Sequence, residues 1–183
     1  MSPTSARLFN IFPAVSLLLG LSLTGVAGCG DKTTTATTTL LSATGQQMGT
    51  ATFTQKGDAP VQVDVSLTGL PAGKHGVHVH DLGKCDPPDF TTAGGHFNPT
   101  TQAHGDPAQA VHHSGDFGNI DIGQSGTGTL SLTTTLSLRA GDPTNPANHA
   151  LIIHQSMDDL TTQPTGNSGA RVACGIIPEP TGG

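Results

Sequence analysis

The sequence has no tryptophan and no tyrosine, and aromatic residues make up only 3% of its 183 residues. Valine, leucine and isoleucine must therefore supply most of the buried surface, in a chain long enough for one domain with a real core. Apolar residues at helical spacing are also scarce. Glycine, with 25 residues, proline, with 13, and threonine are abundant instead. This composition predicts short β-strands joined by turns and long loops.

Positive charge is scarce as well. Lysine and arginine total seven, they are scattered, and the formal net charge is −6 at pH 7. Electrostatic binding of nucleic acid needs a basic patch, so we expect no nucleic-acid partner. The only glutamate is Glu179, in the C-terminal tail. A zinc hydrolase that uses glutamate as its general base is therefore disfavoured.

Three cysteines, an odd number for an exported protein, need an explanation. They are Cys29, Cys85 and Cys174. Residues 8–28 are mostly apolar, and residues 26–29 read VAGC, which resembles the lipobox of bacterial lipoproteins. We predict a lipoprotein signal peptide over residues 1–28 and a lipid on Cys29. The alternative is a permanent membrane-spanning anchor, which Asn10 and Pro13 disfavour.

A polar run, DKTTTATTT, follows at residues 31–39. Such a low-complexity segment predicts a flexible tether, so residues 29–39 are interpreted as a lipidated, threonine-rich tether. The folded domain is then expected over residues 40–183. A lipid on Cys29 predicts a cell-envelope location, with the protein anchored to a membrane and facing the periplasm.

Alternation of apolar and polar residues in VQVDVSL, at 61–67, predicts a half-buried strand. Further strands are expected at 49–54, 76–81, 126–138, 150–154 and 171–177. Residues 82–116 and 155–170 lack a sustained period, and loops of this length are usually functional. The predicted fold class is an all-β, Greek-key antiparallel β-sandwich or barrel, immunoglobulin-like, with two long functional loops.

Seven of the nine histidines lie between Gly73 and Asn119. Clustering at this density indicates metal, because neutral imidazole suits zinc and copper. His78 and His80 are two apart on a predicted strand, so both rings face one side while the neighbouring valines face the other. His154 ends another predicted strand. Two adjacent metal sites fit better than one, because a single ion rarely takes so many protein ligands.

The histidine segments together resemble the copper/zinc superoxide dismutases over residues 40–177. The segments that carry the resemblance are GVHVH (76–80), AGGHFNP (93–99), AHG (103–105), HHSGDFGN (112–119), LIIH (151–154) with DD at 158–159, and GNSGARVACG (166–175). Any one of them alone is weak, but together they are specific.

The resemblance implies a copper site and a zinc site that share one imidazole. The implied copper ligands are His78, His80, His96 and His154. The implied zinc ligands are His96, His104, His113 and Asp116. All-imidazole ligation suits both Cu(II) and Cu(I), and four protein ligands close a structural zinc site.

The resemblance further implies that superoxide is converted to oxygen and hydrogen peroxide by Cu(II)/Cu(I) cycling, protecting the cell envelope. His96 and Arg171 are the implied catalytic residues, with Arg171 orienting the anion. Asp158 is expected to join a copper histidine to a zinc histidine. Cys85 and Cys174 match the family's disulfide, which an exported protein can form.

Several alternatives stay open at this point. The domain could be a copper or zinc buffer without turnover, or a zinc hydrolase or lyase. Arg171 could form a surface ion pair, Asp158 could belong to a solvated loop, and Cys85 and Cys174 could be free buried thiols. His112 could take the place of His113, although the HSGD spacing favours His113. The sequence also leaves open whether the protein is a monomer or a homodimer.

Overall fold

The computed structural model describes residues 1–2 and 32–182. Within that part of the chain, nine strands form one antiparallel sheet, and one short 3-10 turn, η1 (Thr91–Ala93), interrupts the first long loop. The strands are β1 (Thr33–Leu41), β2 (Gln47–Lys56), β3 (Val61–Thr68), β4 (Gly73–His80), β5 (Asp116–Ile122), β6 (Thr127–Thr134), β7 (Ala150–His154), β8 (Arg171–Ile176) and β9 (Thr181–Gly182).

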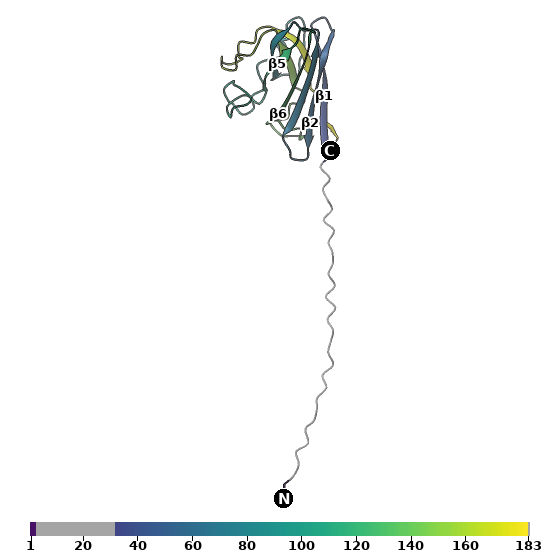
Figure 1. The fold of residues 1–183 in the computed structure, drawn as a ribbon, viewed down its shortest axis with the longest axis vertical. Coiled ribbons are helices and arrows are strands. Elements are labelled where there is room, and N and C mark those ends of the chain that lie inside the picture. The colour runs from purple at the N-terminus through teal and green to yellow at the C-terminus, as the bar shows by residue number, and fades with distance from the viewer. Residues whose placement is uncertain (3–31, 183) are drawn as a thin grey trace.

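The sheet curls until its two ends meet. Paired strands follow the order β5-β4-β7-β8-β1-β2-β3-β6, and β9 adds to β1. β5 and β6 stand at opposite ends of this order, yet they lie so close that a side chain at Gly128 would strike the carbonyl oxygen of Asp121. The result is an eight-stranded, nearly closed antiparallel barrel (Figure 1). The connection from β6 to β7 crosses one end of it, as in a Greek key, so the predicted fold class is confirmed.

Strand β3 forms for the reason that its alternation predicts. Val61, Val63, Val65 and Leu67 point inward and are at most 2% exposed, while the residues between them face solvent. Burying an aliphatic side chain of this size stabilises the fold by about 1.5–3 kcal/mol. The same interior holds the scarce aromatic rings, with Phe53 and Phe117 in contact at 6.3 Å between centroids.

The threonine-rich run is a strand, and its interpretation as a flexible tether is wrong. Residues 33–41 form β1 and pair with β2 along their whole length, so the folded domain begins at about Lys32 rather than residue 40. Ala36, Thr38 and Leu40 alternate inward and are buried. The buried hydroxyl of Thr38 donates to the carbonyl of Ile176 at 2.8 Å. β-branched threonine favours strands, and this period of two outweighs the low-complexity composition.

Residues 3–28 of the predicted signal peptide and the predicted lipidation site at Cys29 lie outside the described residues. Within the residues that the structure does describe, no helix is long and apolar enough to span a bilayer.

Strand β4 separates the barrel core from the histidine site. Val77 and Val79 point into the core and are fully buried, while His78 and His80 lie on the outer face. That face is still buried because the two long loops cover it, residues 81–115 and 155–170 (Figure 1). Val79 holds the first loop through both of its backbone groups, donating to Gly115 and accepting from Phe97.

Candidate metal centre

Four histidines converge on the outer face of β4 and β7. His80 Nε2 and His154 Nε2 are 3.3 Å apart, and the rings of His78 and His96 are 4.0 Å apart between centroids. The two strands supply three of the rings through their pairing, and an isolated bridge between His80 and His96 brings in the loop histidine. One ring nitrogen from each of these four residues lies within 4.8 Å of the others.

A second cluster lies beside the first and is built around Asp116, the first residue of β5. His96 Nδ1 and His113 Nδ1 lie 2.8 and 3.3 Å from Asp116 Oδ1, and His104 Nδ1 lies 3.0 Å from Oδ2. Backbone N–H groups of Gly105 and His113 also donate to Oδ2 and fix the carboxylate. All four side chains of this cluster are buried.

His96 belongs to both clusters. Its Nδ1 lies 2.8 Å from Asp116 Oδ1, and its Nε2 is buried without a hydrogen-bond partner. The buried atoms test whether metal ions fit. Among described residues, four buried side-chain N or O atoms lack a hydrogen-bond partner, and three of them are cluster nitrogens: His78 Nδ1, His96 Nε2 and His104 Nδ1. The last lies 3.0 Å from Asp116 Oδ2 but is not aligned for a hydrogen bond. Buried polar nitrogens without partners are costly unless an ion binds them. Imidazole nitrogen with one carboxylate is a donor set for copper and zinc.

In His78, His80 and His154 the second ring nitrogen is held by the protein, which fixes the orientation of the ring. His80 Nδ1 and His154 Nδ1 donate to the carbonyls of Gly94 and Gly169, at 2.9 and 3.2 Å. These bonds leave Nε2 of both rings free. His78 uses the opposite nitrogen, since its Nε2 lies 2.7 Å from Asp158 Oδ2 and its Nδ1 remains free.

Asp158 connects the two clusters through ring nitrogens that do not face the candidate ions. Its other oxygen, Oδ1, lies 3.0 Å from His104 Nε2, so one buried carboxylate holds a histidine of each site. Asn119 positions it with two hydrogen bonds to its backbone, at 2.8 and 2.9 Å. A side chain at Gly166 would collide with Asp158 Oδ1 and His104 Nε2, so only glycine fits there. The adjacent Asp159 instead accepts hydrogen bonds from loop threonines.

The other histidines stay outside both clusters. His75 lies within hydrogen-bond distance of the carbonyls of His154 and Pro71, as expected for a structural residue. His112 donates to the carbonyl of His113 and does not join the zinc-type cluster, in agreement with the predicted preference. His149 packs against Phe97.

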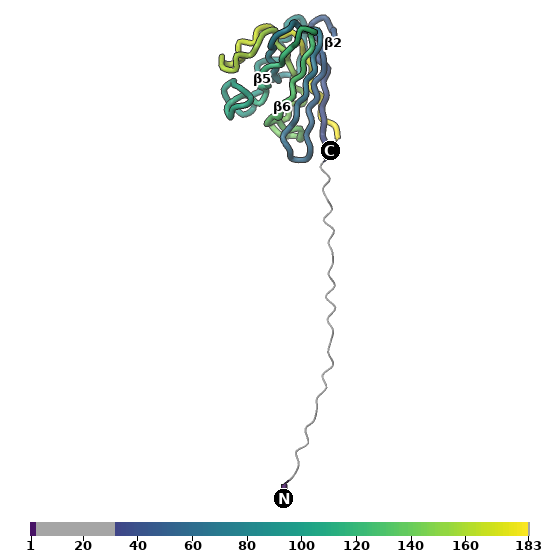
Figure 2. Tube along the Cα trace, in the orientation of Figure 1, coloured from purple at the N-terminus to yellow at the C-terminus, as the bar shows by residue number. Residues whose placement is uncertain are grey.

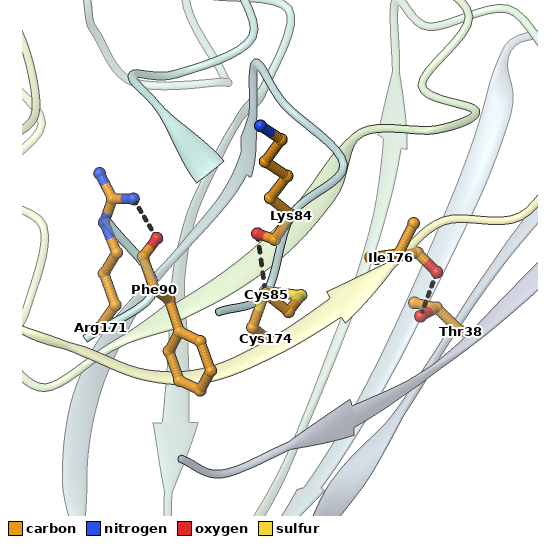
Figure 3. The surroundings of a disulfide bond; sticks show 7 residues. All are labelled: Thr38, Lys84, Cys85, Phe90, Arg171, Cys174 and Ile176. Carbon is orange, nitrogen blue, oxygen red and sulfur yellow. Dashed lines mark hydrogen bonds between the residues drawn. A yellow bond between two sulfur atoms is a disulfide. The ribbon is translucent and has the colours of Figure 1, made fainter. Parts of the chain in front are cut away.

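Arg171, the first residue of β8, is half-buried beside the copper-type cluster. Its two terminal nitrogens donate to the carbonyls of Phe90 and Gly94, both at 2.6 Å. Gly94 also accepts from His80, so one carbonyl links the guanidinium to a cluster histidine. No residue pattern predicts this pair of loop carbonyls, because any residue type supplies a carbonyl. Figure 3 shows the contact with Phe90.

The predicted disulfide between Cys85 and Cys174 is present, with 5.6 Å between the two Cα atoms. It joins the first long loop to β8, three residues after Arg171 (Figure 3). Phe90 packs on Cys174 in a small apolar cluster separate from the main core. The loop that supplies the carbonyls for Arg171 is therefore fixed both covalently and by packing.

Burial leaves the copper-type histidines neutral without metal. It lowers the pKa of His96 to about 4 and that of His154 to about 3, and it lowers the pKa of His78 and His80 as well. Burial also opposes charge on His104, but the carboxylates of Asp116 and Asp158 outweigh it and raise the pKa of His104 to about 9.

These opposite shifts predict that zinc, but not copper, displaces a proton at neutral pH. Metal-free His104 carries a proton below pH 9, and zinc needs its neutral Nδ1. Zinc binding at pH 7.5 is expected to release about one proton, and the number of protons released should fall toward zero above pH 9. Titration calorimetry in two buffers of different ionisation enthalpy measures the release. Equal zinc-binding enthalpies in the two buffers would contradict the prediction, and copper binding to zinc-free protein serves as the low-release comparison.

The fold and the site together define a β-barrel metalloprotein with two buried ion sites joined by one imidazole. Residues 47–177 match the family described as copper/zinc superoxide dismutase. The chain is 38% identical over 184 aligned positions to the copper/zinc superoxide dismutase of Deinococcus radiodurans, covering 93% of this chain and 98% of that one. The chain belongs to the copper/zinc superoxide dismutase family.

Solved structures agree with this assignment. The crystal structure of a SOD-like protein from Bacillus subtilis has a TM-score of 0.69 and 34% identity, covering 77% of this chain and 97% of that one. In a double mutant of that protein a tyrosine and a proline are replaced by histidine. Its structure has a TM-score of 0.71 and 35% identity, covering 78% of this chain and 96% of that one. The two clusters in the present chain match a copper site and a zinc site in full.

Proposed function

We propose that this protein converts superoxide to oxygen and hydrogen peroxide at the cell envelope, with copper held by His78, His80, His96 and His154. The observation that carries the proposal is that His96 belongs to both clusters, with its Nδ1 2.8 Å from Asp116 Oδ1. When bound, copper supplies one-electron exchange between Cu(II) and Cu(I). Zinc, held by His96, His104, His113 and Asp116, has four protein ligands and so has the closed coordination of a structural site.

Arg171 is the residue to which we assign binding and orientation of the superoxide anion. Its guanidinium is half-buried, always charged and held in a fixed direction by two carbonyl oxygens. The other arginine of the barrel, Arg139, instead pairs with Asp58 on the surface and is 55% exposed. The two arginines therefore have different environments, and only Arg171 lies beside the cluster.

We assign proton transfer to His96. Its Nε2 is buried without a hydrogen-bond partner, while its Nδ1 is fixed near Asp116. With copper and zinc bound, the two cations would allow this imidazole to lose both protons, and Nε2 is the atom to which we assign holding a proton for the reaction. Converting two superoxide anions to oxygen and hydrogen peroxide consumes two protons, and His96 Nε2 would supply one of them.

The envelope location is supported by the sequence alone, through the apolar leader and the VAGC lipobox at 26–29. A lipid on Cys29 would anchor the protein and leave the barrel in the periplasm. Mass spectrometry of the N-terminal peptide of the purified membrane protein tests the lipid. Light scattering of the mature protein tests whether it is a homodimer.

Superoxide consumption by copper-loaded protein, inhibited by cyanide, tests the activity. A copper or zinc buffer would take up the same ions without catalysing this reaction. Metal analysis of the same sample is required, since full copper and zinc occupancy without turnover would overturn the proposal.

Replacing Arg171 with alanine is expected to lower the rate constant for superoxide about tenfold or more, because the substrate loses its directional cation. Lysine at this position should recover part of the loss, since it keeps the positive charge but lacks the planar guanidinium with its two terminal nitrogens. Pulse radiolysis measures the rate per bound copper. Arg139→Ala is the matched control and should leave the rate unchanged, so equal effects of the two alanine variants would refute the role of Arg171.

A further inference from the structure

The start of β1 limits how far the barrel can lie from Cys29. Only Gly30, Asp31 and Lys32 separate Cys29 from Thr33, the first residue of the strand. A chain spans at most about 3.6 Å per residue, so the Cα atoms of Cys29 and Thr33 are at most about 14 Å apart. This inference rests on the lipid on Cys29 proposed above. With that lipid in place, the end of the barrel where β1 begins must lie next to the bilayer.

Two lysines, Lys32 and Lys56, lie at that end. Thr33 pairs with Lys56 across β1 and β2, and the N–H of Gly57 donates to the carbonyl of Lys32 at 2.9 Å. Backbones of paired strands are about 4.8 Å apart, so both lysines lie at the same end of the barrel, and their side chains leave the two-stranded ribbon on opposite faces. Both lysines are exposed, and neither forms an ion pair with another residue that the structure describes.

The acidic residue of the same turn does not neutralise them. Asp58 pairs with Arg139, which comes from the β6–β7 connection. The remaining exposed positions of the turn, Ala59 and Pro60, carry no charge. The turn therefore leaves Lys32 and Lys56 available to a negatively charged partner.

We propose that this surface, formed by Lys32, Lys56 and the turn 57–60 and called here the lysine end, rests on anionic lipid headgroups. The partner is the membrane that holds the lipid of Cys29. Basic residues next to an acylated segment add electrostatic attraction to anionic lipid, and a single lipid chain is helped by such a second signal. The short connection restricts the barrel to orientations in which the lysine end faces the membrane.

The catalytic face then points away from the bilayer. Thr33 and Leu41 are eight residues apart along β1, and Leu41 pairs with Cys174 of the antiparallel strand β8. Arg171 lies three residues further in the same direction. At about 3.3 Å per step, Arg171 lies roughly 36 Å along the strands from the start of β1. Figure 2 shows β1 starting beside the C-terminus, with the long loops placed away from that end. Superoxide would reach Arg171 from the periplasm, without passing the negative membrane surface.

Two alanine positions offer a matched test, because they lie in the turns at either end of β2. Ala59 belongs to the lysine end and Ala43 to the opposite turn, and both are exposed. β2 has ten residues, so the two turns are roughly 30 Å apart at about 3.3 Å per residue. In the lipidated protein Cys29 is blocked and Cys85 and Cys174 are joined, so Ala59→Cys or Ala43→Cys introduces the only free thiol.

The experiment attaches a fluorophore to each variant of the lipidated full protein, reconstituted in phosphatidylglycerol-containing vesicles with headgroup-quencher lipids. Quenching should be at least about threefold stronger at residue 59 than at residue 43, given the roughly 30 Å between them. A ten-residue Gly-Ser spacer inserted after Gly30, combined with Lys32→Gln and Lys56→Gln, should remove the difference while leaving dismutase activity unchanged.

Equal quenching at the two positions, or stronger quenching at residue 43, would overturn the proposed orientation. The failure of the anchor itself is recognised separately. If the mass of the N-terminal peptide shows no lipid on Cys29, then the envelope assignment fails before any vesicle is made. If the lipid is present and quenching is equal, the anchor stands and the lysine end is not the membrane-facing surface.

Discussion

Replacing His96 with alanine is expected to lower dismutase activity by more than about a hundredfold, the largest loss of any single substitution in this protein. Losing even an indirect partner of a metal ligand costs about 10–100-fold in affinity or activity, and His96 is a direct member of both clusters. The variant removes one donor from each site and also the Nε2 atom assigned to carry the proton. Superoxide consumption per bound copper, measured with metal content, checks the result.

His112→Ala is the control for this substitution. His112 lies one residue from a zinc-type ligand and donates only to a backbone carbonyl, so its loss should change neither metal content nor rate appreciably. The electron paramagnetic resonance spectrum of Cu(II) gives a second readout. Adding zinc to copper-loaded protein should alter the spectrum in the native chain but not in His96→Ala. A His96→Ala variant with near-native activity at full copper occupancy would refute the shared-imidazole mechanism.

The positions of the histidines in the sequence predicted part of the site, because ligands two residues apart on one strand point to the same face. His78 and His80 face one way on β4 since residues two apart on a strand share a face. The loop ligands His96, His104 and His113 had no such local rule. Their grouping was anticipated from the resemblance to a family, and the structure shows both clusters assembled.

Contacts made by backbone atoms were beyond prediction. The carbonyls of Phe90 and Gly94 that hold Arg171 depend on how the loop folds back, and any residue type supplies a carbonyl. The sequence does not distinguish Gly166 from other loop glycines, but in the structure its proximity to Asp158 excludes every side chain. At residues 33–39 the low-complexity composition favours a tether, but the inward alternation of Ala36, Thr38 and Leu40 outweighs it and the segment is a strand.

Replacing Cys85 and Cys174 together with serine is expected to destabilise the protein by roughly 4–5 kcal/mol, because the bond closes a loop between residues 89 apart in sequence. For a domain of this size the melting temperature should fall by about 10–15 °C. Thermal unfolding of the metal-free proteins measures the loss. Cys29→Ser, which removes the proposed lipidation site outside the described barrel, is the control and should leave the melting temperature of the barrel unchanged.

The same variant should also lose activity at temperatures where it is fully folded, because the disulfide positions Arg171, the residue to which we assign anion binding. Cys85 fixes the loop that carries the Phe90 carbonyl, Phe90 packs on Cys174, and Arg171 is three residues from Cys174 (Figure 3). Without the bond the guanidinium loses its fixed direction, and we expect a loss of about tenfold, similar to that of Arg171→Ala. Combining the two changes should then cost little more than either alone, because both act through one group. Fully additive losses would show that the disulfide contributes to stability without orienting Arg171.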